Sequence, residues 1–560
     1  MIMRILSGMV IAFVSTLSAP IDAQVVLSNS TIYTALPGSF PAFGFNLALA
    51  ESNGDGELDL YVADPQVDTD GRAYVLLGPD FTQAISVSIP SGIWGLGSRW
   101  TVGDLNGDNL ADMALGGPYT TVGGVTSAGR AIVSLAPDFQ TTIELSRPTP
   151  PLTPSGDSFG SGFAVTDYDG DNVVELLVGA ETSTINGSPA AGIIYIFSAA
   201  SQFAGGPVSA IATPFVGQSR YWGRHLAVAD FDGDQHDDLI THSRLPFIGL
   251  GIMPSLDPSA LIQLIPQITS AGSSLGVQMR FVDSNSDGHL DIIASDPDKS
   301  GGGQVLVFSG PSFQNPTFLK PPGQSSGAGS GYGLSYGDVD RDGTIDIVVG
   351  SPYNNSGNLT KNGRVTIFFG PDFVNTQSIY GQYSQSRFGQ GVVVHDFDGD
   401  GYGEILVACG GEWGGGSLHL LQHESLSLQT ANTVSLSAGG TVKFAIQRGK
   451  LAAGAPYLML MSASGSAPGL QIPFAGGSVH LPLNFDAATV FGLQFVNSGV
   501  FVAFQGVLDT KGEAVPRFVV PGGVNEPALF GLPLTFAAVL GEVGPYISAA
   551  TNAKVVTLDP

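Results

Sequence analysis

The chain has little charge, few basic residues and almost no cysteine. Of its 560 residues only 12% are charged, and 48 acids against 21 bases give a net charge of -27. Such a negative field repels nucleic acid and anionic membranes, so we expect neither as a partner. The single cysteine, Cys409, excludes an internal disulfide framework. Disorder is also excluded, because a chain that is 43% hydrophobic can bury a core.

Long apolar segments are missing as well. No segment reaches 18 uninterrupted apolar residues, so we expect no transmembrane segment in the mature chain. Residues 1–23 have the features of a signal peptide: Arg4, an apolar run over residues 5–17, and the small residue Ala23 before Gln24. We therefore expect a secreted, cell-surface or periplasmic protein, and we expect it to be a monomer.

The sequence repeats one nine-residue acidic pattern seven times. The copies begin at intervals of 53 to 63 residues, and a glycine lies seven residues before each of them. Apolar runs of strand length and Gly-rich turns follow each copy, without a helical period. Four short strands in each of seven units predict an all-β fold, a seven-bladed β-propeller over residues 24–424. Residues 25–33 stand where other units have a fourth strand, so we expect them to complete the last blade.

The acidic pattern predicts calcium sites, up to seven in number, in the loops that join the first and second strand of each blade. Calcium takes six to eight oxygen ligands, and we expect side chains at positions 1, 3, 5 and 9 and the backbone carbonyl at position 7 to supply them. Position 12, where an EF-hand needs glutamate, is never acidic here. The expected side-chain ligands are Glu51, Asn53, Asp55 and Asp59; Asp104, Asn106, Asp108 and Asp112; Asp167, Asp169, Asp171 and Glu175; Asp230, Asp232, Asp234 and Asp238; Asp283, Asn285, Asp287 and Asp291; Asp338, Asp340, Asp342 and Asp346; and Asp396, Asp398, Asp400 and Glu404. The expected backbone ligands belong to Glu57, Leu110, Val173, His236, His289, Thr344 and Tyr402.

The order of motifs in each unit is Phe-Gly, then the acidic loop, then Gly-Ala-Pro. Phe159-Gly160 followed by Gly179-Ala180 is a close example, whereas the fourth unit departs from the pattern with His242-Ser243-Arg244. This order resembles the FG-GAP repeat of the propeller in integrin alpha subunits. The resemblance implies a rigid extracellular binding platform, often used in adhesion, without implying a particular ligand.

Residues 425–560 differ from the repeats. They hold six acids and six bases, lack the acidic loops, and contain apolar runs such as residues 457–461. We expect a smaller C-terminal all-β domain, resembling a β-sandwich, of unknown family.

Motifs that suggest catalysis have simpler explanations. Two Gly-x-Ser-x-Gly strings, around Ser158 and Ser274, end at the Phe-Gly glycine and precede strands, whereas a nucleophile elbow precedes a helix. His419 and His423 lack a third metal ligand nearby. We therefore expect a non-enzymatic platform that binds an extracellular protein or glycan. The alternatives are a secreted enzyme or lectin-like subunit acting on polysaccharide, and a structural component of an envelope or matrix.

Overall fold

The structure is a computed structural model, and it is almost entirely β. It describes residues 27–34, 43–65, 70–78, 81–146, 156–167, 171, 173–201, 203, 206–213, 221–243, 249–257, 260, 262–264, 274–397, 402–411, 416–423, 426–428, 433–447, 456–464, 470–474, 477–481, 500–509, 513–521, 529, 532–541, 547–550 and 554–559. The expected signal peptide, residues 1–23, lies outside them. By packing, the chain divides into two units: residues 31–395 with 405–420, and residues 1–30 and 396–404 with 421–560.

Helices contribute little to either unit. The helical segments include two short 3₁₀ turns, η2 (Ala199–Ser201) and η3 (Pro254–Leu256). In the residues that the structure describes, no helix has the length and apolar character needed to cross a membrane.

The repeats form four-stranded sheets, seven of them in the described residues, and neighbouring strands are antiparallel in the first six. In chain order they are β2 (Leu47–Ala50), β3 (Asp59–Asp64), β4 (Arg72–Leu77), β5 (Gln83–Ser86); β6 (Arg99–Gly103), β7 (Asp112–Gly117), β8 (Arg130–Ser134), β9 (Thr142–Glu144); β10 (Phe159–Thr166), β11 (Glu175–Ala180), β12 (Ile193–Ser198), β13 (Ser209–Ala212); β14 (Leu226–Ala229), β15 (Asp238–Ser243), β16 (Gly249–Met253), β17 (Ile262–Leu264); β18 (Met279–Val282), β19 (Asp291–Asp296), β20 (Gln304–Phe308), β21 (Thr317–Leu319); β22 (Gly333–Gly337), β23 (Asp346–Gly350), β24 (Arg364–Phe368), β25 (Thr376–Tyr380); and β26 (Phe388–His395), β27 (Glu404–Cys409), β28 (Ser417–His423).

The seventh sheet takes its fourth strand from the other end of the chain. Its order is β1-β28-β27-β26, with β1 formed by Leu27–Thr34. The prediction that the N-terminal segment supplies this strand is confirmed by that order. A sheet that joins the two ends of the repeat array ties the first repeat to the last.

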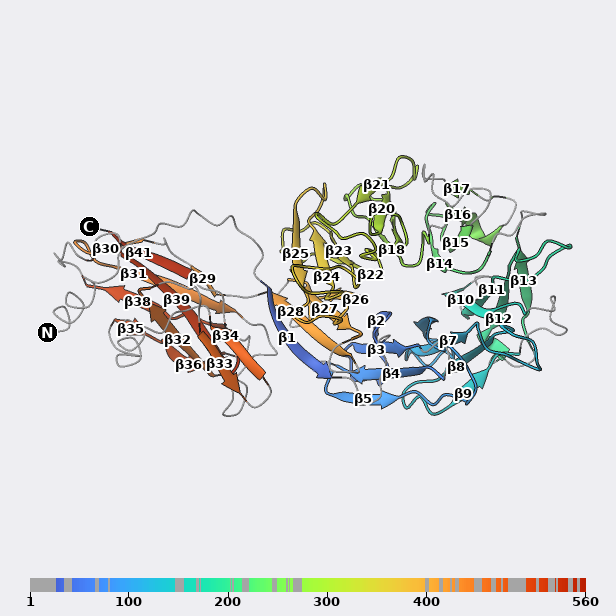
Figure 1. The fold of residues 1–560 in the computed structure, drawn as a ribbon, viewed down its shortest axis with the longest axis horizontal. Helices are drawn as coiled ribbons and strands as arrows, with labels where there is room; N and C mark the ends of the chain where they lie inside the picture. The colour runs from blue at the N-terminus through green and yellow to red at the C-terminus, as the bar shows by residue number, and fades with distance from the viewer. Residues whose placement is uncertain are drawn as a thin grey trace. The chain divides into compact units, whose positions relative to one another are not determined.

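The first strands of the sheets gather around one space. Residues of β2, β6, β10, β14, β18, β22 and β26 all line a single cavity of about 590 Å³. In Figure 1, β2, β10, β14, β18, β22 and β26 lie toward the middle of the repeat region, while β5, β9, β13, β21 and β25 lie at its periphery. This arrangement of repeated antiparallel sheets is consistent with a β-propeller.

Small residues set the distance between neighbouring sheets. The Phe-Gly glycine of one sheet packs against the small residue that ends the second strand of the sheet before it. A Cβ atom on Gly44 would lie 2.3 Å from the Cβ of Ala408, and one on Gly179 would lie 1.8 Å from the carbonyl oxygen of Gly223. Gly44 also has a φ of +71°, which disfavours any other residue. The glycines therefore allow contacts that a side chain would block, and Gly44 makes one between the first sheet and the seventh.

The fourth sheet is the exception among these contacts. His242 stands where the other sheets have Gly, Ala or Ser, and its ring is buried. Its Nδ1 lies 2.7 Å from the carbonyl oxygen of Leu275, which precedes the Phe-Gly-type glycine of the fifth sheet. The imidazole thus replaces a close backbone contact with a hydrogen bond across the seam between these two sheets.

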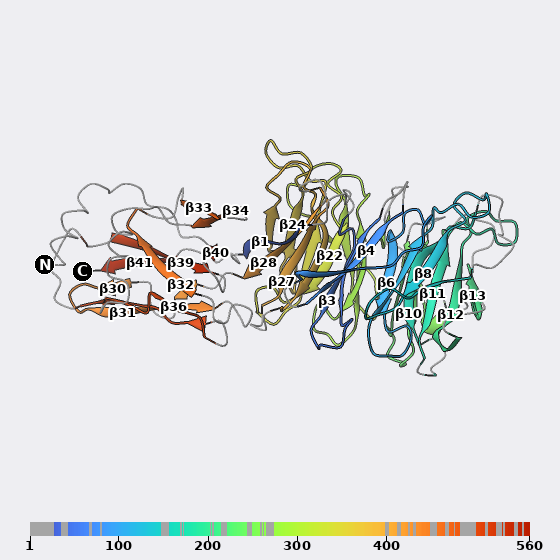
Figure 2. The same cartoon turned by 90° about the horizontal axis from the view of Figure 1, so that it is seen from below.

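The C-terminal residues form two larger sheets and a hairpin. One sheet has the order β29-β31-β38-β35, with β37 paired to β31, and the other has the order β30-β41-β39-β32-β36, with β40 paired to β39. In the side view of Figure 2, β41, β39 and β32 run next to one another. The strands are β29 (Leu426–Leu428), β30 (Thr433–Ser435), β31 (Gly440–Gln447), β32 (Pro456–Ser462), β35 (Phe501–Val502), β36 (Gln505–Val507), β37 (Glu513–Ala514), β38 (Arg517–Val520), β39 (Leu532–Gly541), β40 (Ile547–Ala550), β41 (Lys554–Asp559), and the hairpin β33 (Leu470–Phe474) with β34 (Gly477–Leu481).

One apolar core is shared by these two sheets. Phe444 of β31 and Phe518 of β38 belong to the first sheet, while Met459 of β32 and Phe536 of β39 belong to the second, and all four are buried in the same cluster. The rings of Phe444 and Phe536 lie with centroids 4.9 Å apart. The two sheets therefore pack face to face through aromatic and aliphatic side chains.

Candidate metal sites

Each acidic loop connects the first strand of a sheet to the second. The register pairs the residue just before the loop with the ninth loop residue, as in Ala50 with Asp59 and Gly337 with Asp346. The same pairing recurs in the second to fifth sheets. The two ends of each loop are therefore held side by side by the sheet, and the intervening residues must turn within a short closed path.

The first carboxylate of the first, second, fourth, fifth and sixth loops accepts hydrogen bonds from several backbone N–H groups. In the second loop, Asp104 Oδ1 accepts from Gly107 at 2.7 Å and from Asp108 at 3.1 Å, and Oδ2 accepts from Asn109 at 2.8 Å. Equivalent bonds reach Asp230, Asp283 and Asp338. Glu51 achieves the same with a longer side chain, since its carboxylate accepts from Asn53, Gly54 and Gly56. These bonds fix the direction of the first carboxylate before any ion arrives.

The sixth loop position has a left-handed backbone where the structure describes it. Gly56, Gly288 and Gly343 have φ of 86°, 87° and 85°, and Asn109 has 66°. Gln235 takes the same conformation, with φ of 71°, although glutamine has no special preference for it. The fourth loop therefore keeps the geometry of the others at the cost of a strained residue.

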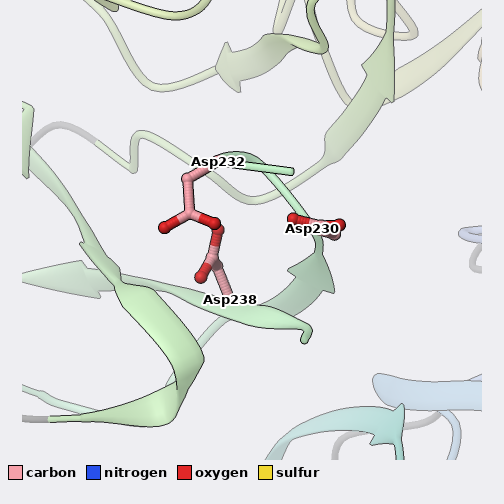
Figure 3. A group of neighbouring side chains, drawn as sticks. All are labelled: Asp230, Asp232 and Asp238. Carbon is pink, nitrogen blue, oxygen red and sulfur yellow. The ribbon is translucent and has the colours of Figure 1, made fainter. Parts of the chain in front are cut away.

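Two loops bring three carboxylates together. Asp230, Asp232 and Asp238 offer oxygen atoms that all lie within 4.8 Å of one another, and so do Asp338, Asp340 and Asp346. Figure 3 shows the side chains of Asp232 and Asp238 pointing toward each other, with Asp230 beside them. Positions 1, 3 and 9 of these loops therefore lie close together, and their binding of an ion stays a prediction.

The remaining predicted ligands do not belong to these two groups of three. At position 5, Asp234 and Asp342 lie outside the two groups of three, and each accepts the N–H of the residue two positions later. Asn53, Asn106 and Asn285 at position 3 leave their loops with fewer carboxylates. The role of the position 7 carbonyls stays a prediction. Asp169, Asp398 and Asp400 lie outside the described residues.

The ninth carboxylate has a second role that the sequence analysis missed. Asp346 is buried, and it accepts the N–H of Val339 at 2.8 Å and that of Gly370 at 2.9 Å. Val339 belongs to the loop itself, and Gly370 follows the third strand of the sheet. The same double link holds Asp59, Asp112, Asp238 and Asp291, through Gly78, Ala136, Ser255 and Gly310. The ninth carboxylate thus fastens the loop to the neighbouring hairpin.

A sequence signal for this link existed. Gly78, Ala136, Gly310 and Gly370 each precede a proline in the repeated endings Gly-Pro-Asp-Phe, Ala-Pro-Asp-Phe and Gly-Pro-Ser-Phe. The donor is a backbone N–H, which no side-chain pattern reveals. The separation varies, at 19 residues for Asp59 and Asp291 and 24 for Asp112 and Asp346, so only the repeated proline-containing ending could have indicated the pair.

Burial makes the charged state of these carboxylates costly. It raises the pKa of Asp346 to about 7 and that of Asp112 to about 6, although amide hydrogen bonds to both groups act in the opposite direction. The pKa of Asp340 is raised as well, first by burial and then by the charge of Asp342. A divalent cation would relieve both effects, because it compensates the lost solvation and the mutual repulsion.

The donor set fits a hard cation. The converging atoms are carboxylate oxygens, without sulfur, and the group in each of the two loops comes from side chains on a short turn held by the sheet. Oxygen-only sets of this kind suit calcium or magnesium rather than zinc or copper.

Comparison with known proteins agrees with the repeat pattern. Residues 53–115 and 283–349 match the FG-GAP-like repeat, and residues 159–197 match the FG-GAP repeat. The chain contains FG-GAP repeats. Its repeats resemble the N-terminal region of integrin alpha subunits: integrin alpha-5 of Xenopus laevis is 28% identical over 212 residues, which is 34% of this chain and 20% of that protein.

Two further proteins are similar in sequence to this chain. Integrin alpha-IIb of Mus musculus is 30% identical over 154 residues, covering 25% of this chain and 15% of that protein. Phosphatidylinositol-glycan-specific phospholipase D of Bos taurus is 25% identical over 370 residues, covering 56% of this chain and 43% of that protein. The chain spans less than half the length of each of these relatives.

Proposed function

We propose that this protein is a secreted, calcium-binding, seven-bladed β-propeller that acts as a non-enzymatic platform for an extracellular protein or glycan. The observation that carries the proposal is the convergence of Asp338, Asp340 and Asp346, and of their counterparts in the fourth loop, within 4.8 Å. Three like charges at this distance repel strongly unless a cation lies between them. Binding a cation is therefore the activity best supported by the geometry.

Calcium fits these loops better than magnesium. Magnesium demands near-ideal octahedral geometry at short distances, whereas calcium accepts six to eight oxygens in flexible arrangements. In the sixth loop the first carboxylate is already fixed by the amides of Asp342 and Gly343, and the ninth by those of Val339 and Gly370. Ligands held by the fold in this way cannot rearrange to a small octahedron, which favours the larger ion.

The platform function rests on the arrangement of the sheets. Seven four-stranded sheets surround one cavity, and glycine contacts such as Gly44 with Ala408 hold neighbouring sheets at close distance. A ring of this kind is rigid, and rigid surfaces lose little entropy on binding. The smaller C-terminal region, with two sheets around one apolar core, fits a β-sandwich domain appended to the propeller.

An enzymatic role is the second candidate, because one relative is named as a phospholipase D. The match covers 43% of that protein, so its activity does not follow from the likeness. Hydrolysis of a phosphatidylinositol-glycan or a polysaccharide by the purified protein would favour this candidate over the platform.

Calcium titration calorimetry of the purified chain tests the metal proposal. We expect saturable calcium binding that is weaker or absent with magnesium, and fewer sites in Asp340→Asn. Asp372→Asn is the matched control, since Asp372 lies in an exposed turn outside the loops and accepts the N–H of Val374. Absence of calcium binding, or an equal loss in both variants, would contradict the proposal. Screening protein and glycan arrays with calcium and with EGTA then tests for a calcium-dependent partner.

A further inference from the structure

The cavity at the centre of the seven first strands is cationic, although the protein is strongly acidic. Among the described residues that line it are three arginines, Arg99, Arg224 and Arg280, and none is an aspartate or glutamate. The arginines carry the charge, since burial lowers the pKa of the lining His225. The chain as a whole has a net charge of -27. A concentration of positive charge in this one concave space runs against the composition of the rest of the chain, so composition alone does not explain it.

Four polar residues of the cavity occupy the same position in their respective repeats. Asn46, Arg99, His225 and Gln278 each stand two residues after the Phe-Gly-type glycine of their sheet, and all four line the cavity. Arg280 stands two residues further along β18, and alternation along a strand puts it on the same face as Gln278. Four different sheets therefore contribute hydrogen-bonding groups to one space.

The arginines differ in how their charge is compensated. Arg224 Nε lies 3.5 Å from a carboxylate oxygen of Glu181. Arg99 donates to the carbonyl of Ser98 at 2.7 Å, and Arg280 donates to the carbonyl of Met279 at 2.8 Å. In the part of the chain that the structure describes, no carboxylate lies within ion-pair distance of these two guanidinium groups. Each guanidinium has five donors, so most of the donors of Arg99 and Arg280 stay available to a ligand.

The neighbouring polar groups form a connected set. Gln278 Nε2 donates to Asn46 Oδ1, and Arg280 approaches Gln278 Oε1 at 3.4 Å. Burial, and then the nearby charge of Arg224, lowers the pKa of Arg99. An anion in the cavity would compensate both, since it supplies opposite charge where solvent is reduced.

We propose that this cavity binds a small oxyanion, a carboxylate or a sulfate- or phosphate-type group, through Arg99 and Arg280. Guanidinium groups match two oxygens of such anions with paired hydrogen bonds. A volume of about 590 Å³ is in the range of small-molecule sites. This inference does not depend on the calcium proposal, because the cavity is lined by the first strands and by none of the predicted calcium ligands.

Sulfate and succinate are suitable probes for the test. Both leave calcium largely free in solution, whereas phosphate precipitates it and citrate chelates it. The full chain in 1 mM calcium is titrated with each anion by calorimetry, against sodium chloride of equal ionic strength. Saturable binding supports the proposal, and a preference for sulfate or for succinate tells a tetrahedral oxyanion from a carboxylate.

Variants then locate the site. Losing one charge-assisted hydrogen-bond donor weakens binding about tenfold to hundredfold, so we expect that loss in Arg99→Gln and in Arg280→Gln. Arg130→Gln is the matched control, since Arg130 pairs with Glu144 at 2.6 Å and does not line the cavity. Arg99→Lys and Arg280→Lys serve if either glutamine variant fails to fold, and both are expected to bind with intermediate affinity.

Two results would overturn the proposal. One is the absence of saturable sulfate or succinate binding by the unmodified protein beyond the effect of sodium chloride. The other is an equal loss of affinity in Arg130→Gln, which would indicate a general charge effect.

Discussion

The repeat region and the C-terminal region are both built of β-sheets, but they differ in the residues that they bury. Residues 425–560 carry six acids and six bases, so the whole net charge of -27 comes from the preceding residues. Buried carboxylates recur in the repeats, at Asp59, Asp112 and Asp346 among others, whereas the described C-terminal residues bury none. The difference teaches that the repeats bury fixed charges beside their apolar clusters, charges that the proposed calcium ions would compensate, whereas the described C-terminal sheets rely on apolar packing.

Removal of calcium should produce the largest difference in stability between the two regions. At 10 mM calcium and a dissociation constant of about 0.1–1 mM, each occupied loop adds about 1.4–2.7 kcal/mol, and several loops together exceed any single substitution. In EGTA we therefore expect hydrogen exchange to accelerate in peptides of β2 to β28 and to stay unchanged in β31 and β39. Equal acceleration in both regions, or none in the repeats, would contradict the claim that calcium stabilises the repeats alone.

The complementary change removes apolar packing from the C-terminal region. Phe536 is fully buried and contacts Phe444, Phe504 and Phe518. Phe536→Ala should lower the unfolding free energy of that region by about 3–5 kcal/mol, with the same loss in calcium and in EGTA. Hydrogen exchange and thermal melting measure it. Val507→Ala, at a side chain that is 61% exposed, is the control. A loss that depends on calcium would show that the two regions are not independent.

A smaller effect distinguishes the two kinds of carboxylate within one loop. Asp346→Ala leaves the buried N–H of Val339 and the partly buried N–H of Gly370 without their acceptor, which costs about 2–3 kcal/mol. Asp342→Ala removes an exposed carboxylate, and without calcium it should change stability by about 0.5 kcal/mol or less. Melting both variants in EGTA checks the ranking. If the two losses are equal, the ninth carboxylate has no structural role beyond the metal.

The smallest expected effect is a pH dependence that changes sign with calcium. The folded pKa values of Asp346 and Asp112, about 7 and about 6, lie above the ordinary value of 3.8. Without calcium, the stability that these groups contribute is complete below about pH 4 and is lost as pH rises through about 6 to 7. The melting temperature in EGTA should therefore be higher at pH 5.5 than at pH 7.5. With saturating calcium it should be higher at pH 7.5, because the ion requires ionised carboxylates. Asp346→Asn should reduce both trends, and unchanged trends would contradict the assignment.

Much of the repeat region follows from local pattern. The acidic loops, the apolar runs and the Phe-Gly glycines each lie within a few residues of one another, and they placed the strands and the convergence of Asp338, Asp340 and Asp346. The N-terminal strand was predictable because the last unit lacked a fourth strand.

Contacts between distant segments were beyond local pattern. The acceptor role of Asp346 toward Gly370 depends on a backbone N–H. The cavity arginines come from separate repeats, and their positions near the Phe-Gly-type glycines do not by themselves show that they line one space. The hydrogen bond from His242 toward Leu275 likewise joins two repeats. The sequence showed that His242 departs from the Gly-Ala-Pro pattern, but its hydrogen-bond partner lies in the neighbouring sheet and was not visible in the sequence.

The glycine contacts between sheets also bear on gene duplication. Apart from the fourth, each repeat carries both halves of a junction: its Phe-Gly glycine faces the repeat before it, and its small residue, such as Gly179, faces the repeat after it. A duplicated or exchanged repeat therefore arrives with surfaces that already fit its new neighbours. The fourth repeat has His242 in place of the small residue, so its junction carries a hydrogen bond to the Leu275 carbonyl where the other junctions have a close contact of small residues.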